Sequence, residues 1–144
     1  MNIPMPVYGN DFCYELAYSE IVLPLVKEFK PEVIIRNGGS DPHFSDKLTD
    51  LGVSLNGLRR MGEIHREIMR ISKSIGITLI GSGYNPNVLP YGWISIILGL
   101  ADIELSLEEP ISPPSWIHND ESILLKAKSI IKEVKEVHSA YWTF

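Results

Sequence analysis

Two short glycine-containing segments carry the side chains best suited to chemistry. The segment "NGGSDPH" follows one apolar run and contributes Asp41, and "GSGYNP" follows a second apolar run and contributes Tyr84. In parallel α/β sheets, ligands bind beyond the carboxyl ends of the strands. If the two runs are neighbouring strands, Asp41 and Tyr84 therefore lie on the same rim of the sheet. A carboxylate beside a phenol predicts a metal ligand and a hydrogen-bond donor to a developing oxyanion.

Each of these residues also has a purely structural interpretation. Asp41 precedes Pro42, and this pair forms turns well. His43 on a polar loop is more often a surface histidine than a ligand, and Asp46 is expected to bond nearby backbone amides. Tyr84 equally fits a buried aromatic residue with a satisfied hydroxyl. The segment "GSGYNP" also resembles a weak phosphate-binding loop, although it lacks a lysine and the longer glycine pattern.

The composition argues against several classes of partner. The 144 residues are 44% hydrophobic and 22% charged with a formal net charge of −5, which fits one globular domain, 1–144. An acidic chain with scattered basic residues is not expected to bind nucleic acid or a membrane directly. The single cysteine, Cys13, cannot form an intrachain disulfide, and the apolar run 93–101 is too short to span a bilayer. We therefore expect a cytoplasmic protein.

The periodicity of the apolar residues predicts an alternation of helices and strands. The expected order is helix 11–30, strand 32–37, helix 55–75, strand 77–83, helix 87–100 and a final helix that begins at Asp120 or Ser122. Pro24 predicts a kink or break in the first helix because it removes a backbone donor. Ser54 is a good N-cap for the second helix, and Gly76 stands where a left-handed C-cap would end it.

The two predicted strands are apolar on both faces and are joined by a helix. This pattern indicates an α/β fold with a three-layer parallel sheet, in which helices cover both faces. A sheet of two or three strands leaves two long edges and does not easily form a stable domain. We therefore expect further strands from another chain or from the rest of a larger sheet.

The order of the motifs resembles the C-terminal part of the histone deacetylase family, within the arginase–deacetylase fold, including acetoin-utilisation and acetylpolyamine amidohydrolase-like proteins. The resemblance covers about residues 2–105. It rests on "NIPMP" with "GNDFCYELAYSEIVLPLVKEFKPEVII", then "GSDPHFSDKLTDLGVSLNGL", "GSGYNP" and "GLADIEL". The middle motif and the Gly-x-Gly-Tyr loop together make it fairly specific.

The resemblance implies roles for individual residues. Asp41 matches the family's aspartate zinc ligand, and Tyr84 matches the tyrosine that polarises the acyl carbonyl and stabilises the oxyanion. His43 stands where the family has several residue types and is not counted as a ligand. The other implied positions are Gly81, Ser82, Gly83 and Leu48 in the substrate pocket, with Ser82 replacing a usual glycine, and Asp46 in a structural role.

The chain departs from the family in the rest of the catalytic set. No His-His pair occurs in it, and the family's Asp-x-His segment with two further zinc ligands has no match besides the "DPH" already assigned to Asp41. A catalytic zinc takes three protein ligands and a water. We therefore expect an incomplete zinc site in this chain alone; zinc is the cofactor that the resemblance implies for the complete family site.

Three explanations follow from this departure. The chain is one half of a split deacetylase that acts on an acetylated amide with an N-terminal half as its partner chain. Alternatively, it is a truncated or interrupted product that folds as a homo-oligomer, or it is a non-catalytic interaction and assembly module.

Overall fold

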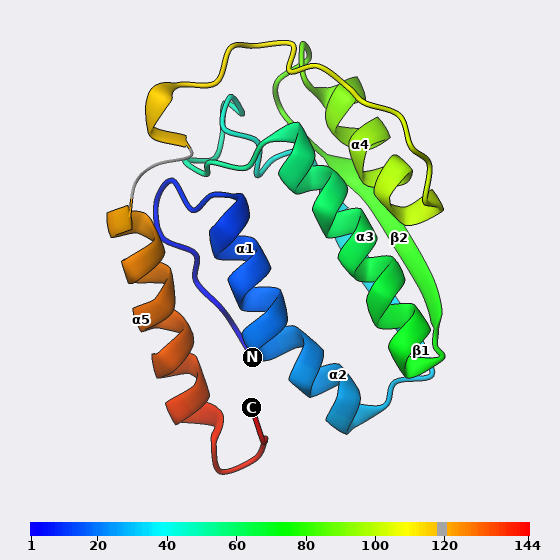
Figure 1. The fold of residues 1–144 in the computed structure, drawn as a ribbon, viewed down its shortest axis with the longest axis vertical. Coiled ribbons are helices and arrows are strands. Elements are labelled where there is room, and N and C mark those ends of the chain that lie inside the picture. Colours follow the sequence, from blue (N-terminus) through cyan, green and yellow to red (C-terminus); the bar gives the residue numbers. More distant parts are fainter. Residues whose placement is uncertain (118–120) are drawn as a thin grey trace.

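The computed structural model describes residues 1–117 and 121–144. Its elements in chain order are α1 (Asp11–Ala17), a π-helix η1 (Tyr18–Val22), α2 (Leu23–Phe29), β1 (Val33–Gly39), α3 (Leu55–Ser72), β2 (Ile75–Ser82), α4 (Leu89–Ala101), a 3-10 turn η2 (Ser115–Ile117) and α5 (Glu121–His138) (Figure 1). None of the helices in these two ranges has the length and apolar character needed to cross a bilayer.

The strands β1 and β2 pair in parallel, as the sequence predicts. Val33 aligns with Ile75 at one end, and Gly39 aligns with Ser82 at the other, after a shift in register beside Gly38. β-branched residues make up about half of each strand and favour this extended conformation. The parallel pairing brings the carboxyl ends of both strands to one edge of the sheet.

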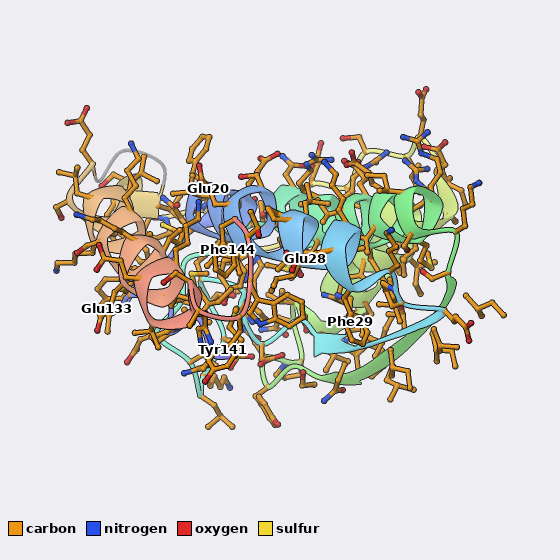
Figure 2. The ribbon with its side chains drawn as sticks, turned by 90° about the horizontal axis from the view of Figure 1, so that it is seen from below. Glu20, Glu28, Phe29, Glu133, Tyr141 and Phe144 are labelled. Carbon is orange, nitrogen blue, oxygen red and sulfur yellow. The ribbon has the colours of Figure 1, made fainter. Side chains whose placement is uncertain are left out.

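Helices cover one face of this sheet. Figures 1 and 2 show α2, α3 and α4 on the same side of the two strands, and His65 of α3 meets Thr78 of β2 through a 2.8 Å hydrogen bond. On the opposite face, five apolar side chains are between 46% and 70% exposed: Val33, Ile35, Ile75, Ile77 and Leu79. We call these five residues the open sheet face. The expected second layer of helices is therefore not supplied by the described residues.

The close contact between α3 and α4 depends on two glycines. A Cβ atom on Gly62 would lie 2.3 Å from the carbonyl oxygen of Ile96, and one on Gly99 would lie 2.1 Å from that of Arg59. The two backbones thus approach until they touch, and the main core forms beside this crossing. Its buried members are Val53, Leu55, Leu58, Met61, Val88 and Ile96.

The C-terminal helix and tail pack on the N-terminal helices. α5 and the segment that runs from α1 into η1 share a second cluster, made of Ala17, Ile21, Ile131 and Val134. The tail then returns to α2, where the Thr143 N–H donates to Glu28 Oε2 at 3.0 Å. The rings of Phe29 and Trp142, the residues next to the two partners of this bond, lie 6.4 Å apart.

The first helix is interrupted where the sequence predicts, and the interruption is a π-helix. The N–H of Leu23 bonds to the carbonyl oxygen of Tyr18, which shifts the hydrogen-bond register by one residue. Pro24 then falls in the first turn of α2, directly after the π-helix, and its missing N–H is consistent with the interruption of the regular helical bonds there.

The predicted end of the second helix is wrong. Ser54 caps its start as expected, since its side chain accepts the Gly57 N–H. The helix ends at Ser72, however, and Lys73 adopts the left-handed C-cap conformation with φ of 55°. Gly76 instead lies inside β2, where a Cβ would stand 1.7 Å from Met69 Sδ. The missing side chain of Gly76 thus leaves room for Met69 of α3, and Gly76 does not end that helix.

The start of the final helix is only partly described. α5 begins at Glu121, so Ser122 lies inside the helix and is not its cap. The alternative cap, Asp120, falls outside the described residues.

Candidate functional site

The tips of β1 and β2 bring Asp41 and Tyr84 to the same rim of the sheet, as the sequence predicts. Ser82 is the last residue of β2, and its hydroxyl donates a hydrogen bond to Asp41 Oδ1. The Ser40 N–H donates to the Ser82 carbonyl at 2.9 Å, which continues the strand pairing one residue past β1. Tyr84 follows two residues later with its side chain 51% exposed. It is therefore not the buried aromatic residue that was the alternative.

The glycines in and around the Tyr84 loop differ in what a side chain at each position would meet. Gly83 has φ of 139°, a conformation that side chains rarely adopt, and a Cβ there would lie 2.1 Å from Ser40 Oγ. Gly92 of α4 borders the same buried serine, because its Cβ would lie 2.4 Å from Ser40 Cβ. A Cβ on Gly81 would meet nothing within 4 Å, so this glycine faces open space at the rim.

Asp46 joins the two loops. Its Oδ2 accepts the Tyr84 N–H at 2.7 Å, and its Oδ1 accepts the Leu48 N–H at 2.9 Å. The expectation that Asp46 bonds backbone amides is therefore confirmed, and one of these amides lies in the other loop. Leu48 itself is 69% exposed on the surface of its loop.

The expectation that His43 is a surface histidine is wrong. Its side chain is 1% exposed, and its Nε2 lies 3.0 Å from Glu109 Oε2. Nδ1 accepts the Ser45 N–H at 3.2 Å and lies 2.9 Å from Ser45 Oγ. Both ring nitrogens thus have partners inside the chain, which leaves neither available to a metal.

Sequence reasoning missed Glu109 and Asn85. Glu109 comes from the irregular segment after α4, and its Oε1 accepts the Leu55 N–H at 2.6 Å. Asn85 is buried and donates from Nδ2 to the Ser45 carbonyl at 2.8 Å. Glu109 stands 66 residues from His43, and no local pattern links them. For Asn85, the only local signal was its place directly after Tyr84.

A half-buried tyrosine, Tyr14, lies close enough to Asp41 for the two side chains to interact electrostatically. Burial, and then the neighbouring Tyr18 and Asp41, raise the pKa of Tyr14 to about 12. The Tyr14 phenol of α1 is therefore neutral across the physiological range, and it is a hydrophobic neighbour of the rim rather than a base.

The residues at the rim do not complete a zinc site. Nowhere in 1–117 or 121–144 do three histidine, cysteine, aspartate or glutamate side chains gather as metal ligands would. Asp41 has Oδ2 as a possible metal-binding oxygen, because its Oδ1 accepts the hydrogen bond from Ser82. Both ring nitrogens of the buried His43 already bind Ser45 and Glu109. A catalytic zinc takes three protein ligands, so at least two would have to come from outside this set.

The comparisons with known proteins identify the family. The profile of the histone deacetylase domain matches residues 1–100. A probable deacetylase of Archaeoglobus fulgidus is 34% identical over 99% of this chain and 41% of its own length. The acetoin utilization protein AcuC of Bacillus subtilis is 30% identical over 81% of this chain and 30% of its own length. The chain thus spans less than half the length of these relatives.

Solved structures of low sequence identity share the fold. The histone deacetylase Clr3 superposes on 99% of this chain with a TM-score of 0.74 and 21% identity, over 22% of its own chain. The HD domain of HDA15 superposes on 99% of this chain with a TM-score of 0.74 and 20% identity, over 35% of its own chain. The α/β arrangement with its parallel strands is that of a histone deacetylase domain, and the chain belongs to the histone deacetylase family.

Proposed function

We propose that this chain supplies one part of a deacetylase active site that hydrolyses an acetylated amide. One observation carries the proposal. Asp41 and Tyr84 stand at the tips of two adjacent parallel strands, and Ser82 and Asp46 tie the two tips together. A carboxylate and a phenol held at one rim fit a site that binds a cation and stabilises an oxyanion.

In this proposal Tyr84 is the catalytic residue of the chain. Its phenol donates a hydrogen bond to the oxygen of the acyl carbonyl as negative charge develops there. A donor aimed at a developing oxyanion stabilises the transition state more than the ground state. Asp46 accepts the backbone N–H of Tyr84, while the Tyr84 side chain is half exposed and accessible to a ligand.

The remaining rim residues form the wall of the proposed substrate pocket. Gly81 leaves open space in which the acyl chain can approach the backbone, Gly83 supplies the positive φ of the loop, and Ser82 stands between them beside Asp41. Leu48 extends from the facing loop as an exposed apolar side chain. Asp46 keeps its structural role by accepting one backbone N–H from each loop.

The proposed site needs a second part of a deacetylase domain. That part would cover the open sheet face, form the third layer and add strands at the open edge, as a parallel sheet requires. It would also supply the ligands that Asp41 lacks if zinc is bound as in the family. We propose that this chain is the C-terminal portion of such a domain, completed by an N-terminal half in the same polypeptide or in a partner chain. In its absence, the open sheet face would pair with a second copy.

A chimera tests this proposal directly. The segment of the Archaeoglobus fulgidus protein that this chain matches, 41% of its length, is replaced by this chain. We expect the purified chimera to bind about one zinc per molecule and to release acetate from an acetyl-lysine amide. The parent protein is the positive control, and a chimera with Asp41→Ala is the negative control. A folded chimera that binds zinc and shows no hydrolysis would contradict the proposed function.

A further inference from the structure

Glu109 lies between two hydrogen-bond donors that belong to different parts of the site. Its Oε1 accepts the N–H of Leu55 at the start of α3 (2.6 Å), and its Oε2 lies 3.0 Å from Nε2 of the buried His43. We propose that Glu109 is a positioning residue: through His43, it holds the loop that carries Asp41 (41–54) against the loop that carries Tyr84 (83–88). Its effect on catalysis rests on the proposed function, but the positioning itself does not.

The partners of the His43 ring fix its tautomer. The backbone N–H of Ser45 can only donate, and it points to Nδ1 at 3.2 Å. Nδ1 therefore accepts, and the proton of the neutral ring sits on Nε2, facing Glu109. The carboxylate thus receives two N–H donors, one on each oxygen.

Contacts continue from His43 to the Tyr84 loop. Ser45, which bonds the ring of His43, also accepts Asn85 Nδ2 through its carbonyl (2.8 Å) and its hydroxyl (3.2 Å). Asn85 directly follows Tyr84, whose own N–H is held by Asp46 one residue beyond Ser45. A path of hydrogen bonds therefore runs from Glu109 through His43 and Ser45 to Asn85, the residue next to the proposed catalytic Tyr84.

This geometry requires a carboxylate rather than an amide. Glutamine has one acceptor oxygen and one donor nitrogen in place of two acceptors. Whichever way the amide is turned, its NH₂ group would face either the Leu55 N–H or the His43 Nε2–H. The other neutral tautomer of His43 does not relieve this mismatch, because Nδ1 would then carry the proton and could no longer accept the Ser45 N–H. One buried donor is left without an acceptor, and such a loss is costly.

The test is hydrogen exchange on the chain itself with Glu109→Gln. A hydrogen bond to a charged group that is lost locally should speed amide exchange by roughly 10- to 100-fold in the opened segment. We expect this acceleration in peptides from 41–54 and 83–88, with peptides from α5 unchanged. The matched control is Glu108→Gln, which makes the same charge change at the exposed neighbouring residue and should alter neither loop.

Two outcomes of this experiment would overturn the proposal. One is unchanged exchange in both loops. The other is equal acceleration throughout the chain, which would make Glu109 a contributor to global stability only. Because no activity is measured, an inactive chimera together with the expected exchange pattern would reject the proposed function and leave the positioning role intact.

A second measurement uses the unsubstituted chain and does not depend on how the variant folds. Long-range ¹⁵N–¹H spectra of the histidine rings distinguish the two neutral tautomers. We expect His43 to carry its proton on Nε2. A proton on Nδ1, or a ring that averages between tautomers as an exposed histidine does, would contradict the assigned geometry.

Discussion

The hydroxyl of Ser82 donates a hydrogen bond to Oδ1 of Asp41, so the last residue of β2 holds the carboxylate that follows β1. The motif that this segment resembles has glycine at the serine position, which makes the bond a feature of this chain. With Oδ1 engaged, Oδ2 is the oxygen that would bind the cation in the proposed site. The bond also closes the sheet at the rim where the substrate is proposed to bind.

Removing this bond should weaken the rim. We expect Ser82→Ala to lower the free energy of unfolding by about 1–2 kcal/mol, the usual scale for a hydrogen bond to a charged group with partial exposure. Urea unfolding monitored by tryptophan fluorescence measures it. Ser139→Ala is the control, since that exposed hydroxyl donates to the Glu136 carbonyl at the end of α5. A Ser82 variant as stable as the unsubstituted chain would show that the bond contributes nothing.

Tyr84→Phe should separate catalysis from stability. In the chimera we expect kcat to fall by roughly 10²–10³, the scale for loss of one oxyanion donor. The half-exposed ring remains in place, so the melting temperature should not change. Tyr91→Phe removes a comparably exposed phenol from α4 and serves as the control for turnover. Equal turnover in both variants would exclude Tyr84 as the oxyanion donor.

The crossing of α3 and α4 should not tolerate a single added methyl group. Gly99→Ala would place a Cβ 2.1 Å from the Arg59 carbonyl oxygen, and we expect a loss of about 1–3 kcal/mol from overpacking. This loss would occur although alanine favours a helix by about 1 kcal/mol over glycine. Gly81→Ala is the matched control, because a Cβ there meets nothing within 4 Å. Thermal unfolding of both variants measures the contrast, and equal melting temperatures would argue against the tight crossing.

The buried His65 should make the chain less stable in acid. Burial, and then the positive charge of Arg36, lower the pKa of His65 in the folded chain below its ordinary value of 6.5. Below about pH 6.5 the unfolded chain therefore binds a proton that the folded chain does not, and stability falls as the pH drops. We expect His65→Gln to flatten this fall between about pH 7 and about pH 5 in urea titrations. A fall as steep in the His65→Gln variant as in the unsubstituted chain would contradict the assignment.

Local patterns predicted the elements and the rim, and long-range contacts decided the rest. The apolar runs gave the parallel strands, and the residues after them placed Asp41 and Tyr84 at the same edge. The burial of His43 escaped prediction because its partner, Glu109, lies far along the chain in a segment without periodicity. No residue near His43 in the sequence indicates that Glu109 is its partner.

The end of α3 was mispredicted for a related reason. Glycine is the usual residue at a left-handed C-cap, and that rule placed the cap at Gly76. Gly76 instead lies in β2, because the Met69 side chain of α3 packs where a Cβ of residue 76 would stand. Lys73 then adopts the left-handed conformation at its own steric cost. The preference of glycine for the C-cap position was therefore outweighed by the packing of α3 on β2.

The open sheet face should drive association of the isolated chain. Parallel strands are normally covered on both sides, and Ile35 and Ile77 stand exposed on the uncovered one. We expect the sedimentation coefficient to rise with concentration, and Ile77→Lys to suppress this rise because a charge cannot be buried cheaply in an apolar contact. Leu125→Lys makes the same change at an exposed position of α5 and should leave association unaltered. If both variants associate like the unsubstituted chain, the contact between copies forms elsewhere, and the open sheet face would have no role in it.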